Sequence, residues 1–228
     1  MNEQDYELRE RRQRMRDQRR RRVRRNRILL GAAVVFIGIT AFWGIKRLFF
    51  SNQNQLEEGW EDAPAMKVEL LTPNEYSRPE IPLEKVNGIV VHYTANPGSS
   101  AEANRNYFEG LKDSGATYAS SHFIIGLEGE IIQCIPSKEI AYASNERNED
   151  TLSIECCHPD ESGVFTQATY DSLVDLVAWL CHRFGLQSTD VIRHYDVTGK
   201  ICPKAFVEDE QAWEQFRSDV ADGINKLA

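Results

Sequence analysis

The chain has 228 residues, which is long enough for one well-packed domain of ordinary size plus short additional segments. Its net charge of −8 conceals an asymmetry, because residues 1–27 contain twelve Arg and five acidic residues, a local charge of +7 that leaves −15 for the remainder. The overall acidity therefore excludes no class of partner, and the two parts are interpreted separately.

A basic run precedes an uncharged apolar segment near the N-terminus. Residues 9–27 are rich in arginine, as in proteins that bind nucleic acids, but residues 28–45 carry no charge and approach the length that crosses a bilayer. Trp43 fits the membrane interface, and the two cations that follow can snorkel, so the span extends to about residue 50. Residues 28–50 are therefore predicted to be an uncleaved transmembrane signal-anchor, and nucleic-acid binding is not expected.

The arginines also set the expected orientation of this span. Positively charged flanks stay on the cytoplasmic side, so residues 1–27 are predicted as a cytoplasmic tail and the chain beyond residue 50 as extracellular. The tail can also contact anionic lipid head groups. Two alternatives fit less well. A cleaved signal peptide would carry an unusually long basic region, and a buried core helix would begin beside twelve arginines.

The remainder divides into a predicted linker and a predicted domain. Residues 51–65 are polar and acidic without a hydrophobic period, which is typical of a linker, and residues 66–228 form one domain. Short apolar runs predict strands, with Glu128-Gly129 as a hairpin turn. Their ranges are 88–93, 121–127, 130–135, 151–157 and 191–195.

Three helices are predicted between and after these strands. Ser99 and Glu102 fit a capping box that opens a helix ending near residue 112. The clearest helix begins near Thr166 and ends at Gly185, since its apolar residues repeat at spacings of three and four. The last helix presents Trp213 and three other apolar residues on one face. Strands mixed with amphipathic helices predict an α/β or α+β domain with a mixed central sheet covered by helices.

Two places carry side chains that suggest chemistry. His92 lies in the middle of an apolar strand, where a polar ring is costly to bury unless something binds it. His194 lies near the end of the last predicted strand, and Cys202 follows eight residues later across a loop that contains glycine. Imidazole and thiolate are both good zinc ligands, and a loop can bring them onto one ion. This spacing matches no standard zinc finger, so on spacing alone metal binding stays open.

Four segments between about residues 86 and 216 resemble one enzyme family. They read VNGIVVHYTA, SSHFIIGLEGEIIQCIP, NEDTLSIECC and IRHYDVTGKICP, and they occur in the family's order at compatible separations. The family is the type-2 N-acetylmuramoyl-L-alanine amidases, which includes bacterial cell-wall amidases, phage amidase-lysozymes and peptidoglycan recognition proteins. Four ordered motifs are far more specific than any one of them.

The resemblance implies a zinc site and two catalytic side chains. By position, His92, His194 and Cys202 would hold one zinc ion and leave a fourth tetrahedral position for water. Glu155, on an apolar strand, would be the general base and then the proton donor to the leaving nitrogen. Lys200 would stabilise the oxyanion. A solvated strand-edge carboxylate and a solvated loop lysine are the respective alternatives.

Some positions depart from the family or need no chemical role. Some members place a Tyr before the second-strand His, where this chain has Ser121, which shifts weight onto Glu155. Tyr142 replaces a Trp or His often found in its loop and is a candidate substrate contact. His122 reads as a structural histidine and His182 as an exposed one. Cys134, Cys156 and Cys181 read as small buried side chains, whereas Cys157 would share a sheet face with Glu155. The disulfide state of these four cysteines stays open.

The resemblance implies a function outside the membrane. A membrane-anchored zinc amidase would hydrolyse the bond between N-acetylmuramoyl residues and L-alanine in peptidoglycan, in cell-wall remodelling or lysis by a bacterium. The alternative is a non-catalytic peptidoglycan-binding receptor, whose family members typically lose the metal cysteine that this chain keeps as Cys202. A lysin acting on other cells would be tethered to its producer by the anchor. The sequence gives no prediction of the oligomeric state.

Overall fold

The structure, a computed structural model, describes residues 57–228. The predicted cytoplasmic tail at 1–27 and the predicted membrane span at 28–50 lie outside this range. Within the described range, no helix combines the length and apolar character needed to cross a membrane.

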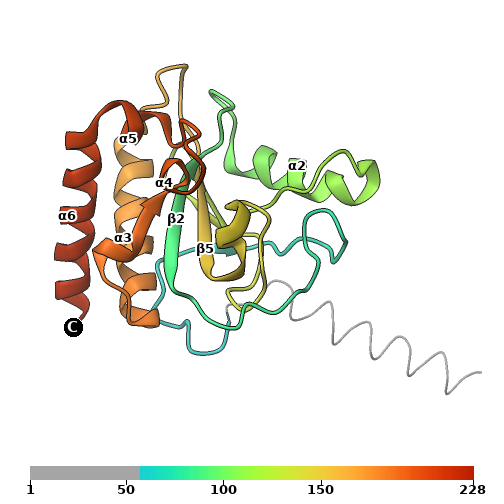
Figure 1. The fold of residues 1–228 in the computed structure, drawn as a ribbon, viewed down its shortest axis with the longest axis horizontal. Helices are drawn as coiled ribbons and strands as arrows, with labels where there is room; N and C mark the ends of the chain where they lie inside the picture. Colours follow the sequence, from blue (N-terminus) through green and yellow to red (C-terminus); the bar gives the residue numbers. More distant parts are fainter. Residues whose placement is uncertain (1–56) are drawn as a thin grey trace, which may run out of the picture. The chain divides into compact units, whose positions relative to one another are not determined.

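A mixed six-stranded sheet runs through the described residues (Figure 1). In spatial order it consists of β1 (Lys67–Val68), β4 (Ile131–Gln133), β3 (Phe123–Ile125), β5 (Thr151–Cys156), β2 (Gly88–Tyr93) and β6 (Val191–Arg193). Neighbouring strands are parallel except β3 and β4, which form an antiparallel hairpin. Gly129 adopts φ +81° at its turn, which only glycine does readily, so the hairpin predicted there is confirmed.

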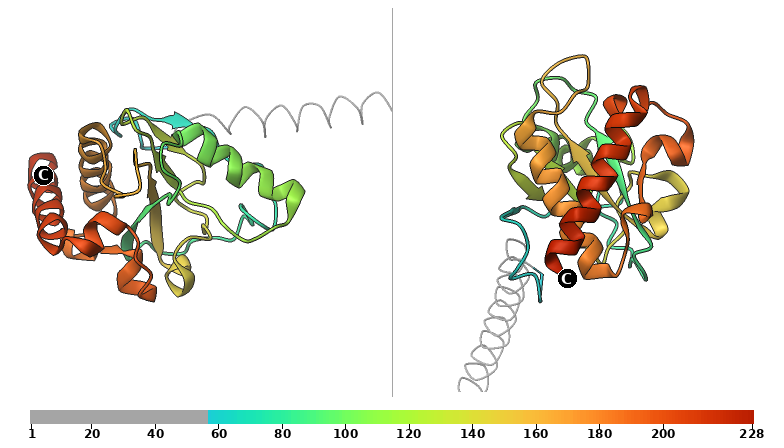
Figure 2. Two further views of the ribbon diagram at one scale, coloured as in Figure 1. Left: turned by 90° about the horizontal axis from the view of Figure 1, so that it is seen from above. Right: turned by 90° about the vertical axis from the view of Figure 1, so that its left-hand side faces the viewer.

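Helices cover both faces of this sheet, as the sequence predicted. The layers are visible in Figure 2, with α3 (Gln167–Phe184) and α6 (Glu210–Leu227) on one side and α2 (Ala101–Ser114) on the other. The larger apolar cluster joins alternate strand residues to α3 and α6, and the smaller one joins the remaining strand residues to α2. Shorter elements complete the fold: α4 (His194–Thr198), α5 (Lys204–Glu208) and the 3₁₀ turns η1 (Asn145–Glu149) and η2 (Ser188–Asp190).

Capping explains where the helices begin and end. Thr166 accepts a hydrogen bond from the Thr169 N–H at the start of α3, and Gly185 ends the helix with φ +67°, so both predicted boundaries are confirmed. The N-cap of α2 lies one residue later than predicted. Ser100, not Ser99, caps α2 by accepting from the Ala103 N–H, whereas the Ser99 hydroxyl donates to the Asn96 carbonyl.

The last strand is shorter than predicted, and this changes the setting of His194. β6 ends at Arg193, and His194 begins helix α4 instead of closing a strand. The carboxylate of Asp196 accepts a hydrogen bond from the Arg193 N–H at 2.8 Å, which caps the new helix. Gly199 ends α4 with φ +76°. His194 is therefore the first residue of the short helix α4. The chain reverses after α4 and leads to Cys202.

Residues 57–65 differ from the linker predicted over 51–65. Trp60 is 1% exposed and packs its indole against Phe123 and Trp179, with ring centroids 6.0 and 4.7 Å away. Arg183 donates to the Gly59 carbonyl, and its guanidinium lies 5.7 Å from the Trp60 ring centroid. The folded unit thus begins before residue 66, because one tryptophan in a polar run enters the core.

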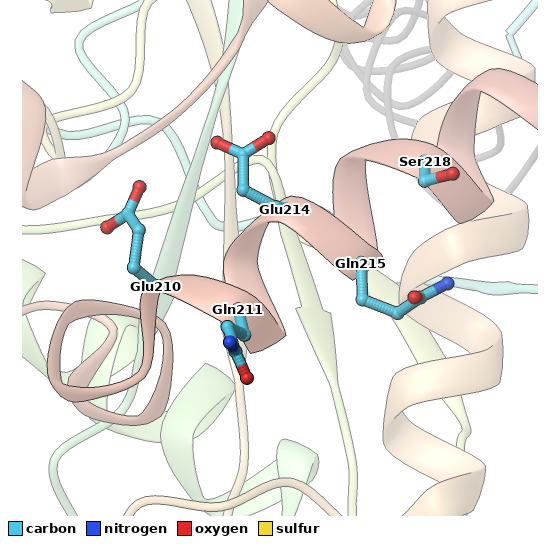
Figure 3. A pocket seen from close by; sticks show the side chains of 5 residues that line it. All are labelled: Glu210, Gln211, Glu214, Gln215 and Ser218. Atoms are coloured by element: carbon cyan, nitrogen blue, oxygen red, sulfur yellow. The ribbon is translucent and has the colours of Figure 1, made fainter.

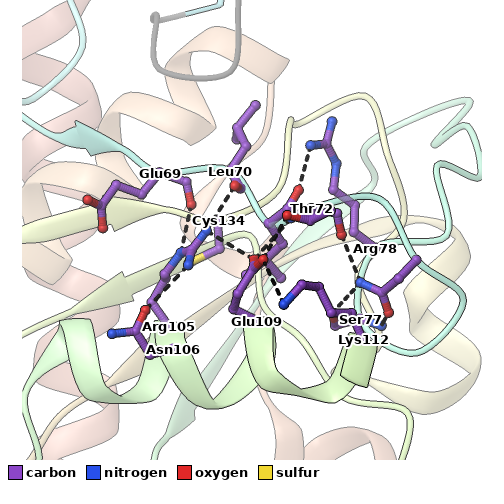
Figure 4. Close-up of polar contacts among 12 residues, drawn as sticks. Glu69, Leu70, Thr72, Ser77, Arg78, Arg105, Asn106, Glu109, Lys112 and Cys134 are labelled. Atoms are coloured by element: carbon purple, nitrogen blue, oxygen red, sulfur yellow. Dashed lines mark hydrogen bonds and ion pairs between the residues drawn. The ribbon is translucent and has the colours of Figure 1, made fainter. Parts of the chain in front are cut away.

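Hydrogen bonds to charged side chains of α2 hold the extended segment after β1 (Figure 4). Glu109 accepts hydrogen bonds from both the backbone N–H and the hydroxyl of Thr72, at 3.0 and 2.7 Å. Arg105 donates to the carbonyls of Glu69 and Leu70. These bonds satisfy backbone groups that belong to no strand, so the segment is held in place without a regular ladder.

Candidate functional site

His92 and Glu155 lie side by side on the two central parallel strands. The register of β2 and β5 pairs the Cα atoms of His92 and Glu155, so both side chains leave the sheet on the same face. The apolar residues on either side of them, such as Val91 and Ile154, point to the opposite face and enter the larger core. The alternation of side-chain direction along the two strands therefore brings an imidazole and a carboxylate to the same face of the sheet.

The segment after β6 adds the second imidazole and the thiol. Helix α4 contacts β2 (Figure 1), and the rings of His194 and His92 have centroids 4.6 Å apart. The Tyr195 N–H donates to the Cys202 carbonyl at 2.9 Å, which closes the loop that returns Cys202 to the strands. The Cys202 Sγ atom lies 3.8 Å from His92 Nδ1.

These three residues fit a metal ion by their geometry and by their chemistry. One ligand atom from each of His92, His194 and Cys202 lies within 4.8 Å of the other two, and all three residues are buried. Two imidazole nitrogens and one sulfur form a donor set that suits Zn²⁺, which usually takes a fourth ligand. The structure thus brings together the three residues whose spacing in the sequence left metal binding open.

The protonation of the two histidines favours a metal, whereas the thiol needs a bound cation to ionise. Burial, with the nearby His194 and the charge of Lys200, lowers the pKa of His92 well below its usual value, so the ring is neutral at pH 7. Burial likewise lowers the pKa of His194. Burial raises the pKa of the Cys202 thiol to about 12, while the Tyr93 backbone N–H and Lys200 act against that rise. A bound cation would supply the charge that a thiolate needs here.

Glu155 is a carboxylate without a structural partner. The residue is partly exposed, but its Oε2 atom is buried and accepts no hydrogen bond from any residue between 57 and 228. Burial raises the pKa of Glu155 to about 8, and the positive charge of Lys200 opposes the rise. A carboxylate with a buried, unpartnered oxygen beside His92, His194 and Cys202 is suited to taking up and releasing a proton.

Lys200 is exposed but lies close enough to act on the whole cluster. Its charge lowers the pKa values of Glu155, His194 and Cys202 as well as that of His92. Lys200 therefore favours the deprotonated form of each of these four groups.

Tyr142 lies in the loop that leads to the cluster rather than in the cluster itself. Its half-buried ring contacts the exposed ring of Tyr118 edge-to-face, with centroids 5.6 Å apart. The Tyr142 N–H donates to the Ser120 hydroxyl at 2.9 Å. Ser121 is buried and donates to the carbonyls of Phe123 and Ser153, so its hydroxyl is used within the sheet.

Two residues that sequence reasoning missed contact the histidines. Ser144 Oγ lies 3.1 Å from His92 Nε2, and Asn145 Oδ1 lies 3.4 Å from His194 Nε2. The sequence offered one faint signal, since Ser and Asn are frequent in turns, but nothing in it pointed to the histidines.

The remaining histidines and cysteines have other roles. His182 is exposed, as predicted. His158 is buried, with its ring centroid 5.0 Å from that of Tyr93 and its Nδ1 2.8 Å from the Asp160 carbonyl oxygen. All five cysteines are buried and free, which confirms the small buried side chains predicted for Cys134, Cys156 and Cys181.

His122 is confirmed as a satisfied structural histidine. Its Nδ1 accepts from the Ser153 N–H at 3.0 Å, and its Nε2 lies 2.9 Å from the Glu139 carbonyl, to which it donates. One neutral tautomer satisfies both contacts, whereas protonation would direct an N–H at the Ser153 N–H. Burial accordingly lowers the pKa of His122 to about 4.

The lowered pKa of His122 leads us to expect a loss of folding stability in acid. The unfolded chain binds a proton near pH 6.5 and the folded chain only near pH 4, so stability falls as pH falls through that window and is regained above it. Between pH 7.5 and pH 5 the expected loss is about 2 kcal/mol. Urea unfolding of zinc-free wild type and His122→Gln should show a pH dependence smaller by that amount in the variant. The exposed-site control His182→Gln should match wild type, and equal slopes for His122→Gln would contradict the assignment.

A hollow on the outer surface of α6 is separate from this cluster. Figure 3 shows its lining: Glu210, Gln211, Glu214, Gln215 and Ser218. It contains two carboxylates but no imidazole or thiol, and Glu210 is paired with Arg193 at 2.7 Å. It therefore adds nothing to the donor set around His92.

Comparison with known proteins connects this geometry to a family. The sequence model of a family described as N-acetylmuramoyl-L-alanine amidase matches residues 82–205, a range that includes the whole cluster. The chain is 38% identical over 160 residues to the N-acetylmuramoyl-L-alanine amidase CwlL of Bacillus licheniformis, covering 64% of this chain and 44% of that protein. It is 33% identical over 168 residues to BlyA, an amidase of the same description from Bacillus subtilis (strain 168), with the same two coverages.

The fold is also shared with solved structures. The structure of PlyL is similar with a TM-score of 0.58 at 25% identity, over 68% of this chain and 96% of that one. The similarity to PlyL covers nearly all of that chain, whereas this chain spans less than half the length of the curated relatives it matches.

Proposed function

The chain belongs to the N-acetylmuramoyl-L-alanine amidase family, and from that premise we propose that it uses zinc to hydrolyse the bond between N-acetylmuramoyl residues and L-alanine in peptidoglycan. The observation that carries this proposal is the convergence of His92, His194 and Cys202, with Glu155 paired to His92 across the two central strands. The amidase names of the curated relatives support the substrate.

We assign the metal to the three buried donors. Bound there, zinc would supply Lewis acidity, which polarises the scissile carbonyl and makes water more acidic. The two histidines would bind as neutral imidazoles, consistent with their lowered pKa values, and Cys202 would bind as a thiolate. The burial of all three keeps competing water away from the donors.

Glu155 moves the proton in the proposed reaction. Its carboxylate takes a proton from the attacking water and delivers it to the amide nitrogen as the carbon–nitrogen bond breaks. The products are the muramoyl carboxylic acid and a stem peptide with a free L-alanine amino group. The raised pKa of Glu155 suits a group that must both accept and release a proton near neutrality.

Lys200 and Tyr142 are assigned to the substrate side. Negative charge develops on the carbonyl oxygen during attack, and the Lys200 ammonium stabilises it electrostatically. Tyr142, with the exposed Tyr118 against its ring, offers an aromatic edge for the substrate groove.

A non-catalytic peptidoglycan receptor is the alternative that the chain supports less well. Binding alone would need neither an unpartnered buried carboxylate oxygen at Glu155 nor a complete His, His and Cys donor set. Both features are present, so hydrolysis is the function that they favour.

The location remains a proposal that rests on sequence. We propose that residues 28–50 anchor the chain in a bacterial cell membrane, with residues 1–27 in the cytoplasm and the catalytic domain outside, where peptidoglycan lies. Protease added to intact protoplasts should digest the catalytic domain and spare the tail. Protection of the catalytic domain would contradict this topology.

Product analysis tests the proposed reaction. The full-length chain in detergent, supplied with zinc, is incubated with purified peptidoglycan, and the soluble products are examined by mass spectrometry. Free stem peptides with L-alanine at the N-terminus are expected, without new reducing sugar ends. Reducing ends, or cleavage within the peptide, would assign a different bond, and retention of the chain on the polymer without products would favour the receptor.

A further inference from the structure

The short turn at residues 143–150, just before β5, is held by side-chain hydrogen bonds and contacts both histidines. Asn148 Oδ1 accepts hydrogen bonds from the backbone N–H groups of Ala143 and Ser144, at 3.0 and 2.6 Å. At the other end, the Thr151 hydroxyl donates to the Arg147 carbonyl at 2.6 Å, which joins the turn to the first residue of the strand that carries Glu155. The turn is therefore a rigid extension of the sheet rather than a loose loop.

Ser144 contacts the side of the His92 ring that faces away from the cluster. His92 Nδ1 lies 3.8 Å from Cys202 Sγ, whereas Nε2 lies 3.1 Å from Ser144 Oγ. If Nδ1 faces the metal, the neutral ring carries its proton on Nε2, where the Ser144 oxygen accepts it. Ser144 is 1% exposed, so water does not compete for this bond.

Asn145 makes the corresponding contact with His194. Its Oδ1 atom lies 3.4 Å from His194 Nε2, which leaves Nδ1 for the cluster. The backbone of Asn145 has φ +54°, a left-handed conformation that Asn adopts more readily than most residues. The unusual backbone points consecutive side chains, Ser144 and Asn145, at two different rings.

We infer that Ser144 and Asn145 are positioning residues that fix the tautomer and orientation of both histidine ligands toward zinc. The inference rests on the proposed zinc site and deepens it. Histidine ligands commonly donate their free ring N–H to an oxygen, and that bond orients the ring and strengthens the ligand. In this chain one turn supplies the oxygen for both histidines, so the same segment pre-arranges two of the three zinc donors.

Metal affinity and a cobalt spectrum test this inference without measuring catalysis. The zinc dissociation constant of the full-length chain in detergent is measured by competition with a chromophoric chelator. Ser144→Ala should weaken binding about 10–100-fold. Asn145→Gly keeps the left-handed backbone but removes the side-chain oxygen. It should weaken zinc binding less than Ser144→Ala, because the Asn145–His194 contact is longer than the Ser144–His92 contact. In the Co²⁺-loaded Ser144→Ala chain, the visible ligand-field bands should shift, since a reoriented imidazole changes the field at the metal.

Matched variants separate positioning from a loss of structure. Ser120→Ala removes another buried hydroxyl that bonds the same loop, through the Tyr142 N–H, without touching either histidine, and should bind zinc like wild type. Asn145→Asp retains an acceptor oxygen and should keep the affinity that Asn145→Gly loses.

The possible outcomes distinguish a failure of the proposed zinc site from a failure of the inference about Ser144 and Asn145. If wild type binds no zinc, the proposed function fails, and the inference fails with it. If wild type binds zinc and Ser144→Ala binds equally well with an unchanged cobalt spectrum, the inference alone is overturned. If Ser144→Ala does not fold, Asn145→Gly decides: unchanged affinity and spectrum overturn the inference, and a loss that Asn145→Asp restores supports it.

Discussion

Replacing Glu155 with glutamine should lower kcat for amide hydrolysis by a factor of about 10²–10⁴, the usual contribution of a general acid–base group. Glutamine has nearly the same shape but cannot take a proton from water at neutral pH. The variant should fold, because the buried Oε2 atom makes no hydrogen bond within residues 57–228 that the substitution would break. The measurement is the initial rate of release of L-alanine-terminated peptides from peptidoglycan.

Zinc affinity distinguishes this explanation from damage to the metal site. Glu155 is not among the three converging donors, so zinc binding to Glu155→Gln should stay close to wild type. Glu128, exposed at the β3–β4 turn, provides the control, and Glu128→Gln should retain full activity. A Glu155→Gln chain with full zinc occupancy and nearly full activity would remove Glu155 from the mechanism.

Replacing Cys202 with serine should abolish zinc-dependent activity. The thiolate is the one sulfur donor in the cluster, so its loss should weaken zinc binding by more than the 10–100-fold expected for an outer contact such as Ser144. Chelator should inactivate wild type in the same way. Zinc added afterwards should restore wild type but not the variant.

The same substitution should remove the stabilisation that zinc gives to the folded chain. At a zinc concentration 100 times the dissociation constant, binding stabilises the native state by about 2.7 kcal/mol. Urea unfolding with and without zinc should show this increment in wild type and not in Cys202→Ser. Cys181→Ser changes a buried cysteine on α3, so it should lower stability while keeping the increment. A zinc increment that survives in Cys202→Ser would place the metal elsewhere.

Local pattern in the sequence was sufficient for the elements that position the donors. Strand β2 was predicted with its observed bounds, because a run of β-branched residues buried on both faces has few other interpretations. The bounds of α3 followed from a threonine cap and a terminal glycine. Alternation along β5 places Glu155 and Cys157 on one face and Cys156 on the other, and the two apolar clusters divide in that way.

Features set by contacts between distant residues, or by a local cap that follows a strand-like run, were not predicted from the sequence. The sequence around Trp60 is polar and acidic, and only its packing against Phe123 and Trp179 makes that segment part of the domain. His194 begins a helix because Asp196 caps the Arg193 N–H, an interaction that the strand-like residues before it concealed. Ser144 and Asn145 reach their histidines across 52 and 49 residues of chain, and no local pattern encodes such a separation.

The most direct test of the account is a zinc titration of activity. The full-length chain in detergent is stripped of metal with chelator, and zinc is added back in fractions of one equivalent while release of L-alanine-terminated peptides from peptidoglycan is followed. The account predicts no release without metal, a linear rise to a plateau at one equivalent, and no rise in Cys202→Ser. Activity that persists in the stripped wild type, or an equal rise in Cys202→Ser, would contradict the central claim that one zinc ion on His92, His194 and Cys202 supports the reaction.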